Sequence, residues 1–325
     1  MTSRILITGA SGFVGRELVA HLASQYGVRL RLALRGHATL IKLNTPYETV
    51  TTGDIDGRTQ WDLALDGVDV VVHLAARVHV LREHSPNPAQ AFRDTNLHGT
   101  VQLARAASQR GVKRFVFISS VGVNGFKTEA HKPFTEWHKP QPHNPYAQSK
   151  WEAEQALRKV ALESGMEFVI IRPPLVYGPN APGNFSHLVR GVLARIPLPL
   201  AAVRNLRSMV GLDNLVNFIG VCCMHPHAAN QTFLVSDGQD LSTVDLVNGI
   251  AKGLHSKVWF VPIPLWILAV GAALFGQGAT LQRLTGNLQV DISKARDMLG
   301  WTPPISVDEG LRRATLSWKK SETLL

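Results

Sequence analysis

Tyr146 and Lys150 stand four residues apart in the segment Asn144-Pro-Tyr-Ala-Gln-Ser-Lys150. Residues 151–158 are mostly strong helix formers without Gly or Pro, so we expect a helix that carries both side chains on one face. A charged lysine beside a phenol lowers the phenol's pKa towards neutrality. Such a phenol exchanges a proton with a carbinol or carbonyl oxygen near pH 7. An isolated Tyr-x-x-x-Lys pair also occurs on solvated helix faces. The other motifs of the sequence therefore decide whether this pair is catalytic.

A serine completes the candidate catalytic set. Residues 114–118 form an apolar run that reads as a strand, and two hydroxyl residues, Ser119 and Ser120, follow it. In a doubly wound sheet, ligands bind beyond the carboxyl ends of the strands. We therefore expect Ser120 to hold a substrate oxygen against Tyr146, with Lys150 as the third catalytic residue.

A glycine-rich turn follows the first apolar strand, residues 4–8. Gly9, Gly12 and Gly15 lie between this strand and a helical pattern that begins at residue 16. This context is typical of a dinucleotide site. Gly9 permits the tight turn, Gly12 lets the backbone approach a pyrophosphate at the helix N-terminus, and Gly15 lets helix and strand pack closely. The remaining residues expected in this cofactor-binding turn are Ser11, Phe13 and Val14.

The second strand, residues 29–34, ends at Arg35. An NAD site usually offers a carboxylate to the ribose here, whereas a guanidinium suits a 2′-phosphate. Arg35, with Arg16 as a second cation, favours NADP(H) over NAD(H); the alternative is that Arg35 stacks on adenine. Asp54 is expected at the adenine edge or in an ordinary turn. Further cofactor-binding candidates follow other strands: Ile55, Leu74, Ala75, Ala76 and Pro173.

Strands and helices alternate up to the strand at residues 167–172, which predicts an α/β protein with a Rossmann-type, doubly wound parallel sheet. After residue 173, Pro and Gly become dense, and helices are expected near 185–195, 213–225 and 242–254. We predict a dinucleotide-binding domain over residues 1–173 and a smaller, mostly helical substrate domain over 174–325, with later chain crossings back to the sheet.

Three further features have structural interpretations. His73 lies inside an apolar run and is expected to be a hydrogen-bonded core histidine. Asn96, in a helical stretch, is expected to bridge backbone groups. Residues 265–275 form the most apolar stretch, which is too short to span a bilayer. We favour a buried helix of the second domain for this stretch over peripheral membrane contact.

The composition restricts the class of protein. The net charge of +10 suits an anionic ligand, but the Lys and Arg residues are scattered, which disfavours nucleic-acid binding. Cys222 and Cys223 are adjacent and predict neither a disulfide nor a zinc site, so we expect no metal and a reducing compartment. The chain opens directly into a strand without a recognisable signal peptide, and we expect a cytoplasmic protein.

The motifs together resemble those of the extended short-chain dehydrogenases/reductases, the NAD-dependent epimerase/dehydratase family. The shared features are the glycine turn, the Ser-Tyr-Lys set and the run Arg172-Pro-Pro-Leu-Val-Tyr-Gly-Pro179. Several runs resemble bacterial UDP-N-acetylquinovosamine-forming 4-keto-sugar reductases, which are often labelled as members of the UDP-glucose 4-epimerase family. These runs are residues 73–80, 145–154, 233–238 and 241–243.

The resemblance implies roles for single residues. Lys150 would bond the nicotinamide ribose and tune Tyr146, and both would contact the cofactor. Asn184 would contact the nucleotide end of the substrate. Arg207 would clamp the UDP diphosphate, and Arg283 is a second candidate clamp. The substrate-binding candidates are Ser120, Val121, Tyr146, Asn184, Arg207 and Arg283.

One departure from the family pattern is informative. Dehydratases of this family carry an acidic pair directly after the catalytic hydroxyl, whereas Val121-Gly122-Val123 follows Ser120 here. The sequence therefore disfavours 4,6-dehydration.

The resemblance implies an NAD(P)H-dependent reductase of the C4 ketone of a UDP-linked 6-deoxy-4-keto-N-acetylhexosamine. Its product would be a UDP-6-deoxy amino sugar, such as UDP-N-acetylquinovosamine, for surface polysaccharides such as the O-antigen of lipopolysaccharide. The alternatives are a UDP-hexose 4-epimerase with tightly bound NAD and, more remotely, a non-catalytic nucleotide-sensing protein. Relatives often dimerise through two helices, one of them the Tyr-Lys helix, so a homodimer is expected by analogy.

Overall fold

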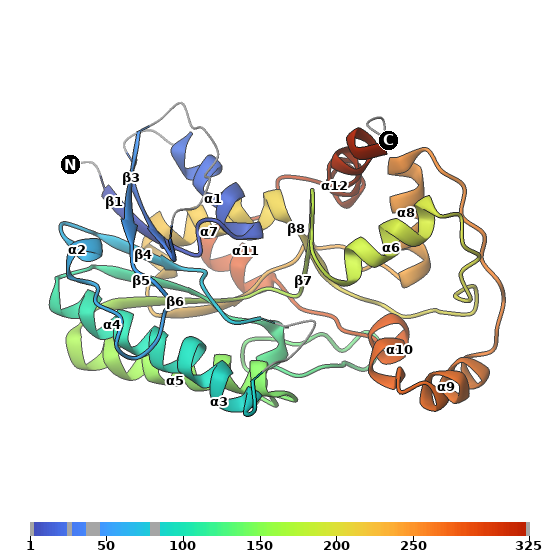
Figure 1. Ribbon diagram of the computed structural model, residues 1–325, viewed down its shortest axis with the longest axis horizontal. Coiled ribbons are helices and arrows are strands. Elements are labelled where there is room, and N and C mark those ends of the chain that lie inside the picture. Colours follow the sequence, from blue (N-terminus) through green and yellow to red (C-terminus); the bar gives the residue numbers. More distant parts are fainter. Residues whose placement is uncertain (1–2, 25–27, 37–45, 79–84, 323–325) are drawn as a thin grey trace.

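The computed structural model describes residues 3–24, 28–36, 46–78 and 85–322. A seven-stranded sheet with helices on both faces forms one part, and a smaller group of helices lies beside it (Figure 1). Every neighbouring pair of strands in this sheet is parallel. The predicted doubly wound α/β fold is therefore confirmed. In spatial order, the strands are β3 (Tyr47–Thr51), β2 (Val28–Leu34), β1 (Ser3–Thr8), β4 (Val70–His73), β5 (Arg114–Ile118), β6 (Glu167–Arg172) and β9 (Gln231–Leu234).

The sheet is covered on both faces, which explains why its strands are apolar runs rather than alternating ones. Successive residues of β1 show this directly, since Ile5 and Ile7 belong to one core and Leu6 to the other. The helices over the first face are α1 (Phe13–Ala23), α7 (Leu212–Met224) and α11 (Ser293–Leu299). Those over the second are α2 (Asp62–Leu65), α4 (Thr100–Gln109) and α5 (Pro145–Ser164).

The order of the strands reverses direction between β1 and β4. In open α/β sheets, ligands bind in the crevice outside the carboxyl ends of the strands at such a switch point. The turn after β1, the chain after β4 and the chain after β5 all leave the sheet at this edge. The topology therefore brings the predicted cofactor and catalytic segments to one side of the sheet.

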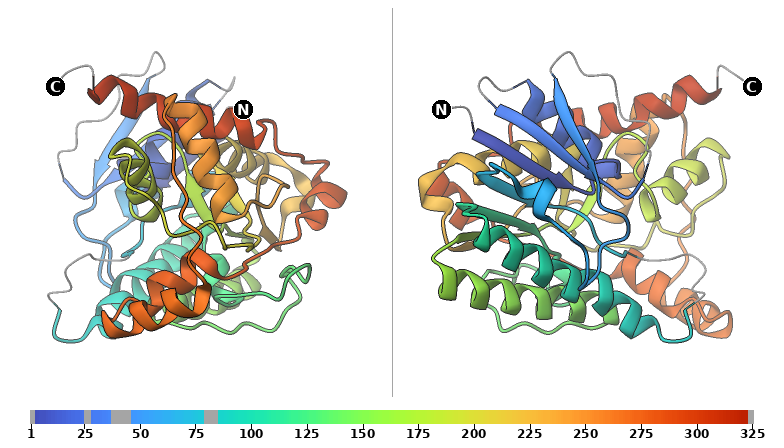
Figure 2. Two further views of the ribbon diagram at one scale, coloured as in Figure 1. Left: turned by 90° about the vertical axis from the view of Figure 1, so that its right-hand side faces the viewer. Right: turned by 60° about the vertical axis from the view of Figure 1, so that its left-hand side comes forward.

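The smaller part has its own apolar core, to which three helices contribute. These are α6 (Asn184–Leu193), α8 (Thr243–Leu254) and α12 (Val307–Glu322), beside a two-stranded sheet of β7 (Leu175–Tyr177) and β8 (Met209–Gly211). After β8 the chain returns to the large sheet through α7 and β9. The two views of Figure 2 show the helices of this part beside the sheet. The domain boundary near residue 173 stays a prediction.

The most apolar stretch forms α9 (Leu265–Leu274), which is followed by α10 (Gly278–Thr285). The prediction of a buried helix is wrong, because no residue of α9 is buried. Its main neighbour is α10, and both lie at the margin of the molecule (Figure 1). In the described part of the chain, no helix is long and apolar enough to cross a membrane.

The core histidine and the bridging asparagine are confirmed. His73 is fully buried, and its two ring nitrogens hydrogen-bond with Thr8 Oγ1 at 2.7 Å and with Thr100 Oγ1 at 3.0 Å. Burial, and then the nearby Lys150 charge, lower the pKa of His73 to about 3, so its imidazole is neutral.

Asn96 lies in a π-helical turn, Asp94–Gly99, between α3 (Pro88–Arg93) and α4. Its side chain accepts the Arg77 N–H at 2.8 Å and donates to Arg77 O and to Ser149 Oγ, both at 3.0 Å. It thereby ties the chain after β4 to helix α5.

The Gly15 position should not tolerate a side chain. A Cβ there would lie 2.1 Å from Gly9 O, so Gly15→Ala must shift either α1 or the turn. We expect the free energy of unfolding to fall by about 1–3 kcal/mol, the usual cost of overpacking. Chemical denaturation at equilibrium measures this change. Gly36→Ala is the matched control, because nothing lies within 4 Å of its added Cβ, and an equal loss in both variants would contradict the packing explanation.

Candidate active site

The glycine turn has the geometry that a pyrophosphate cradle needs. Gly9 has φ +70°, and a Cβ there would approach Ala75 N to 2.8 Å, so only glycine fits this position. Gly12 is the N-cap of α1; within the described chain, no side chain caps this helix and no acidic residue lies in its first turn. Free amides and the positive end of the helix dipole suit an anion. These residues therefore fit the dinucleotide that the motif predicts.

The chain segments around this turn are held together by hydrogen bonds that backbone N–H groups donate. The Leu74 N–H donates to Thr8 O at 3.3 Å, and the Ala75 N–H donates to Thr8 Oγ1 at 3.2 Å. On the other side, the Val121 N–H donates to Pro173 O at 3.0 Å. The predicted residues after β4, β5 and β6 thus lie at the same edge of the sheet as the glycine turn.

Arg35 and Asp54, predicted at the adenosine end of the cofactor, contact each other. Arg35 Nε lies 2.9 Å from Asp54 Oδ1, and both side chains are 83% exposed. Ile55 follows and is half-buried, and a Cβ on Gly99 would come within 2.7 Å of its side chain. Arg16, the second predicted cation, donates through Nε to Ser11 O at 2.9 Å and so fixes the glycine turn.

Helix α5 begins at Pro145, directly before Tyr146. The Asn144 side chain caps it by accepting the Ala147 N–H at 2.8 Å, and proline is favoured in the first helical turn. This start places Tyr146 in the first turn and Lys150 one turn later. The predicted Tyr-Lys helix is confirmed.

Ser120 and Tyr146 are brought together. The Ser120 hydroxyl accepts the Gly122 N–H at 3.1 Å, and its side chain also hydrogen-bonds with the Tyr146 phenol. A Cβ on Gly122 would lie 3.3 Å from both Ala147 Cβ and Ser120 Oγ, so this glycine lets the strand end approach α5 closely. The structure thus brings together the two residues that we expect to hold a substrate oxygen between them.

The pKa values of Tyr146 and Lys150 differ from the expectation. Burial raises the pKa of Tyr146 to about 12, against a smaller lowering by the Ser120 hydrogen bond. Burial lowers the pKa of Lys150 to about 7, against a raising effect of Glu154. The expected depression of the phenol's pKa by Lys150 is therefore wrong for the protein's own side chains. The physical reason is that loss of hydration penalises the phenolate and the ammonium alike.

Lys150 is 1% exposed, and its Nζ lies 4.2 Å from the centroid of the Phe117 ring on β5. A cation over an aromatic face gains some of the electrostatic stabilisation that it loses with water. Glu154, one turn further along α5, supplies a nearby negative charge.

A buried network that the sequence analysis missed lies beneath these residues. Glu154 is fully buried and accepts bonds from Arg172 Nε at 2.9 Å, Arg172 Nη2 at 2.5 Å and Ser119 Oγ at 2.5 Å. Arg172 Nη1 donates further to Asn124 Oδ1 at 3.0 Å. The signal in the sequence is that Glu154 follows Lys150 by four residues, on the same face of the helix. The network joins α5 to the ends of β5 and β6.

The two predicted substrate arginines also lie near each other. Burial, and then the charge of Arg283 on α10, lower the pKa of Arg207. Arg207 Nη1 donates to Gly286 O at 3.0 Å, and among the described residues neither arginine forms an ion pair with a carboxylate. Two adjacent guanidinium groups without a counter-charge suit a diphosphate. Asn184 is exposed at the first position of α6.

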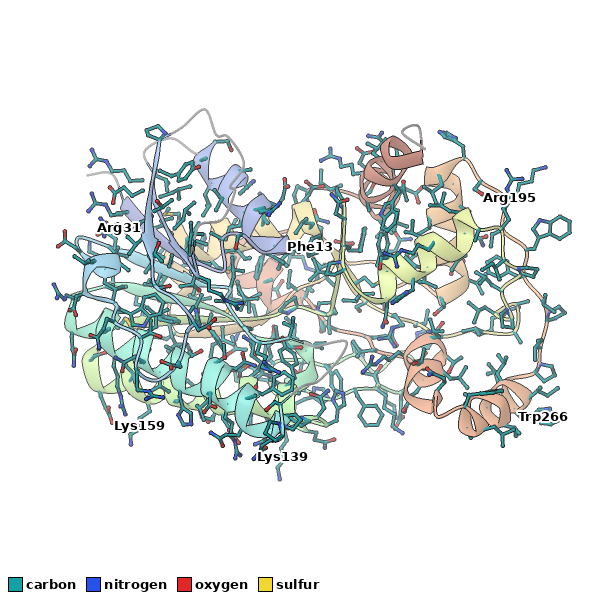
Figure 3. All side chains as sticks on the ribbon, in the orientation of Figure 1. Phe13, Arg31, Lys139, Lys159, Arg195 and Trp266 are labelled. Atoms are coloured by element: carbon teal, nitrogen blue, oxygen red, sulfur yellow. The ribbon has the colours of Figure 1, made fainter. Side chains whose placement is uncertain are left out.

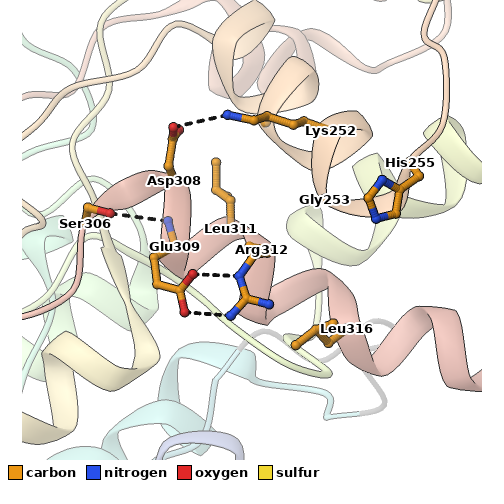
Figure 4. A pocket seen from close by; sticks show the side chains of 10 residues that line it. Lys252, Gly253, His255, Ser306, Asp308, Glu309, Leu311, Arg312 and Leu316 are labelled. Atoms are coloured by element: carbon orange, nitrogen blue, oxygen red, sulfur yellow. Dashed lines mark hydrogen bonds and ion pairs between the residues drawn. The ribbon is translucent and has the colours of Figure 1, made fainter.

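A surface pocket of about 410 Å³ between α8 and α12 contains none of the predicted site residues (Figure 4). Its charged side chains neutralise one another, since Lys252 pairs with Asp308 at 3.3 Å and Arg312 with Glu309 at 2.6 Å. The predicted chemistry therefore belongs to the strand ends of the large sheet and not to this pocket.

The Glu154–Arg172 pair should be important for stability. Glu154→Gln leaves the Arg172 charge buried without a counter-charge, and we expect a loss of about 3–5 kcal/mol in the free energy of unfolding. Glu152→Gln, on the same helix, breaks the more exposed pair with Arg93 and should cost at most about 1 kcal/mol. Denaturant titrations of both variants give the comparison, and similar losses would show that burial of the pair has no special weight.

The stability contribution of Lys150 should depend on pH. Its folded pKa of about 7 lies below the ordinary value of 10.5, so between these values only the unfolded chain binds the proton. Wild-type stability therefore rises with pH across this window, and below pH 7 the cost of the buried charge is fully present. Lys150→Met removes that cost and should be more stable than wild type near pH 7.

The advantage of Lys150→Met should shrink by a few kcal/mol as pH rises past 10.5, since one pKa unit corresponds to about 1.4 kcal/mol. Calorimetric melting at several pH values measures it. Lys159→Met is the control, because Lys159 lies on the same helix and its side chain is 78% exposed. A pH-independent difference for Lys150→Met would contradict the buried-charge explanation.

The chain was compared with known proteins. A family model described as the NAD dependent epimerase/dehydratase family matches residues 5–219. A UDP-glucose 4-epimerase of Vibrio cholerae is 44% identical over 314 residues, which cover 96% of this chain and 94% of that protein.

Two solved structures have the same fold. A UDP-glucuronic acid 4-epimerase of Bacillus cereus, in complex with UDP-glucuronic acid and NAD, has a TM-score of 0.78 at 21% identity and covers 98% of this chain and 99% of its own. The structure of RMD from Pseudomonas aeruginosa, complexed with NADPH, has a TM-score of 0.74 at 23% identity. The match covers 98% of this chain and 100% of the RMD chain. The family match spans more than half of the chain and confirms the predicted resemblance. The chain belongs to the NAD-dependent epimerase/dehydratase family of extended short-chain dehydrogenases/reductases, and it is an enzyme.

Proposed function

We propose that this protein uses NAD(P)H to reduce the C4 ketone of a UDP-linked 6-deoxy-4-keto-N-acetylhexosamine. The observation that carries the proposal is the arrangement of Ser120, Tyr146 and Lys150: the Ser120 side chain hydrogen-bonds with the Tyr146 phenol, and Lys150 lies one turn further along α5. A phenol held in this way can donate its proton to the oxygen of a carbonyl that is being reduced. The exposed Arg35 favours the reductase over the epimerase, because an exchangeable NADPH suits net reduction.

The chain's own residues have separate tasks in this reaction. When bound, NAD(P)H supplies the hydride for the C4 carbon. The phenol of Tyr146 donates its proton to the C4 oxygen. The Ser120 hydroxyl, held by the Gly122 N–H, hydrogen-bonds with the tyrosine oxygen as negative charge develops there. Lys150, with a pKa of about 7, carries its charge part of the time near neutral pH and favours the phenolate that remains.

For the cofactor, Arg35 supports NADP(H) over NAD(H). It is an exposed cation directly after β2, where a carboxylate would repel a 2′-phosphate. Arg35 can still bind a phosphate although it pairs with Asp54, because an exposed ion pair contributes at most about 1 kcal/mol of stability. Relatives of similar fold are complexed with NAD in one case and with NADPH in another.

For the substrate, the adjacent Arg207 and Arg283 support a diphosphate. Arg207 is held in place by its bond to Gly286 O, and the positive charge of Arg283 lies close enough to lower its pKa. The Bacillus cereus relative binds a UDP-sugar, which fits this assignment. We propose that the product serves the synthesis of a surface polysaccharide.

A 4-epimerase is the second candidate function, and a specific observation favours it. The Vibrio cholerae relative, at 44% identity over nearly the whole chain, is named UDP-glucose 4-epimerase. Such an enzyme would keep its NAD and interconvert UDP-hexoses without net consumption of a reduced cofactor. The nucleotide that the purified protein carries therefore discriminates between the two functions.

The test is to incubate the protein with UDP-4-keto-6-deoxy-N-acetylglucosamine and NADPH, and to follow the loss of nicotinamide absorbance. We expect consumption of NADPH by wild type and a decrease of about 10²–10⁴-fold in rate for Tyr146→Phe, the usual contribution of a general acid. Tyr47→Phe, on β3, is the matched control and should keep the wild-type rate. Tightly bound NAD, with interconversion of UDP-hexoses and no NADPH consumption, would instead establish the epimerase.

A further inference from the structure

The surface around α9 is an exposed apolar feature that the active site does not explain. We define the apolar face by six side chains that are each between 44% and 81% exposed: Trp259, Leu265, Trp266, Val270, Leu274 and Phe275. A helix that is apolar on all sides is normally buried. Here no residue of α9 is buried, so this surface lacks a cover within the described chain. Large exposed apolar patches mark sites of interaction.

The two chain segments that form and adjoin the apolar face contain no acidic residue. Residues 246–290 contain no Asp or Glu, and carry the exposed Lys257 close to Trp259. Residues 168–212 contain no Asp or Glu either, and their exposed arginines are Arg190, Arg195 and Arg204. The two segments meet at the apolar face, because the Leu198 N–H donates to Trp259 O and the Val261 N–H donates to Leu198 O, both at 2.8 Å.

Figure 3 shows the end of the molecule that carries α9. Trp266 projects outward from α9, and Arg195 projects from the end of α6 at the same end. Lys139 and Lys159, also labelled, lie away from this end of the molecule. Arg195 and Lys257 are both exposed and lie within three residues of the Leu198–Trp259 pairing, so cations lie beside the Trp259 end of the apolar face.

We propose that the apolar face docks the protein on the surface of an anionic lipid bilayer. Tryptophan and phenylalanine with neighbouring Lys and Arg are the residue types of interfacial membrane segments. A helix of ten residues is about 15 Å long, half of the hydrocarbon thickness, so α9 lies in the interface rather than across it. Charge complementarity selects this partner: anionic headgroups attract the acid-free border, whereas two copies of the same cationic surface repel each other.

The active-site residues leave this surface free. Ser120, Tyr146 and Lys150 lie at the strand ends of the large sheet, and none of the six residues of the apolar face belongs to the proposed catalytic set. None of the residues substituted in the binding tests below belongs to the proposed catalytic or substrate-binding set, so the tests of membrane binding and of catalysis can fail independently.

The first test is co-sedimentation of the full chain with vesicles of equimolar phosphatidylglycerol and phosphatidylcholine. We expect wild type to sediment with these vesicles, less so with phosphatidylcholine alone, and less at high salt. The variant Trp266→Glu with Leu274→Glu should bind the anionic vesicles at least about tenfold more weakly, because two large apolar side chains leave the interface. Wild type that stays in the supernatant with anionic vesicles would overturn the proposal.

The matched control is Trp137→Glu with Leu63→Glu, which changes the same residue types at positions that are 81% and 82% exposed elsewhere on the surface. It should bind as wild type does. Equal losses in the two double variants would also overturn the proposal, since they would trace binding to net charge alone.

The charged border is tested separately. Arg195→Glu with Lys257→Glu should weaken binding to the anionic vesicles severalfold, whereas Lys159→Glu with Lys139→Glu, of identical net charge, should not. Both double variants replace exposed charged side chains, so both should keep the wild-type fold. If wild type instead self-associates in sedimentation velocity, and Trp266→Glu with Leu274→Glu abolishes that association without any vesicle binding, the partner is a second copy and the proposal fails.

Discussion

The burial of the Lys150 ammonium is the constraint on which the active site depends. Water is replaced by the Phe117 ring and by the charge of Glu154, so the pKa of Lys150 falls to about 7 and not further. Glu154 can lie there because Arg172 and Ser119 satisfy its oxygens. A single buried network thereby influences the charge of Lys150, the proposed catalytic lysine, and also fixes α5 against the ends of β5 and β6.

Close backbone packing provides the second constraint. The positive φ of Gly9 and the lack of space at Gly15 hold α1 directly over the end of β1. Phe13, in the first turn of α1, packs against the core of the sheet and also against the core of the smaller helical part. The predicted cofactor turn is therefore in contact with both parts of the molecule, as the proposed reaction between a cofactor and a sugar nucleotide requires.

The proposed catalytic residues and the proposed docking surface lie in different parts of the molecule and depend on different interactions. At the strand ends a few polar groups are fully buried, and burial raises the pKa of Tyr146 and lowers the pKa of Lys150. At α9, apolar side chains remain in contact with solvent, and the cations beside them lie on segments without acidic residues. At the strand ends, exclusion of water strengthens the electrostatic interactions of the polar groups. At α9, the proposed lipid bilayer would cover the exposed apolar side chains.

The sequence alone determined the parallel sheet, the glycine turn, the Tyr-Lys helix and the family, because these depend on local spacing and on apolar periodicity. Only the tertiary structure decided the protonation of Tyr146 and Lys150, since burial comes from strands and helices far apart in the chain. It also revealed Arg172 as the partner of Glu154, which lies eighteen residues earlier. The sequence could not predict the exposure of α9 either. An apolar run predicts burial, but the fold decides whether a neighbouring layer exists to bury it.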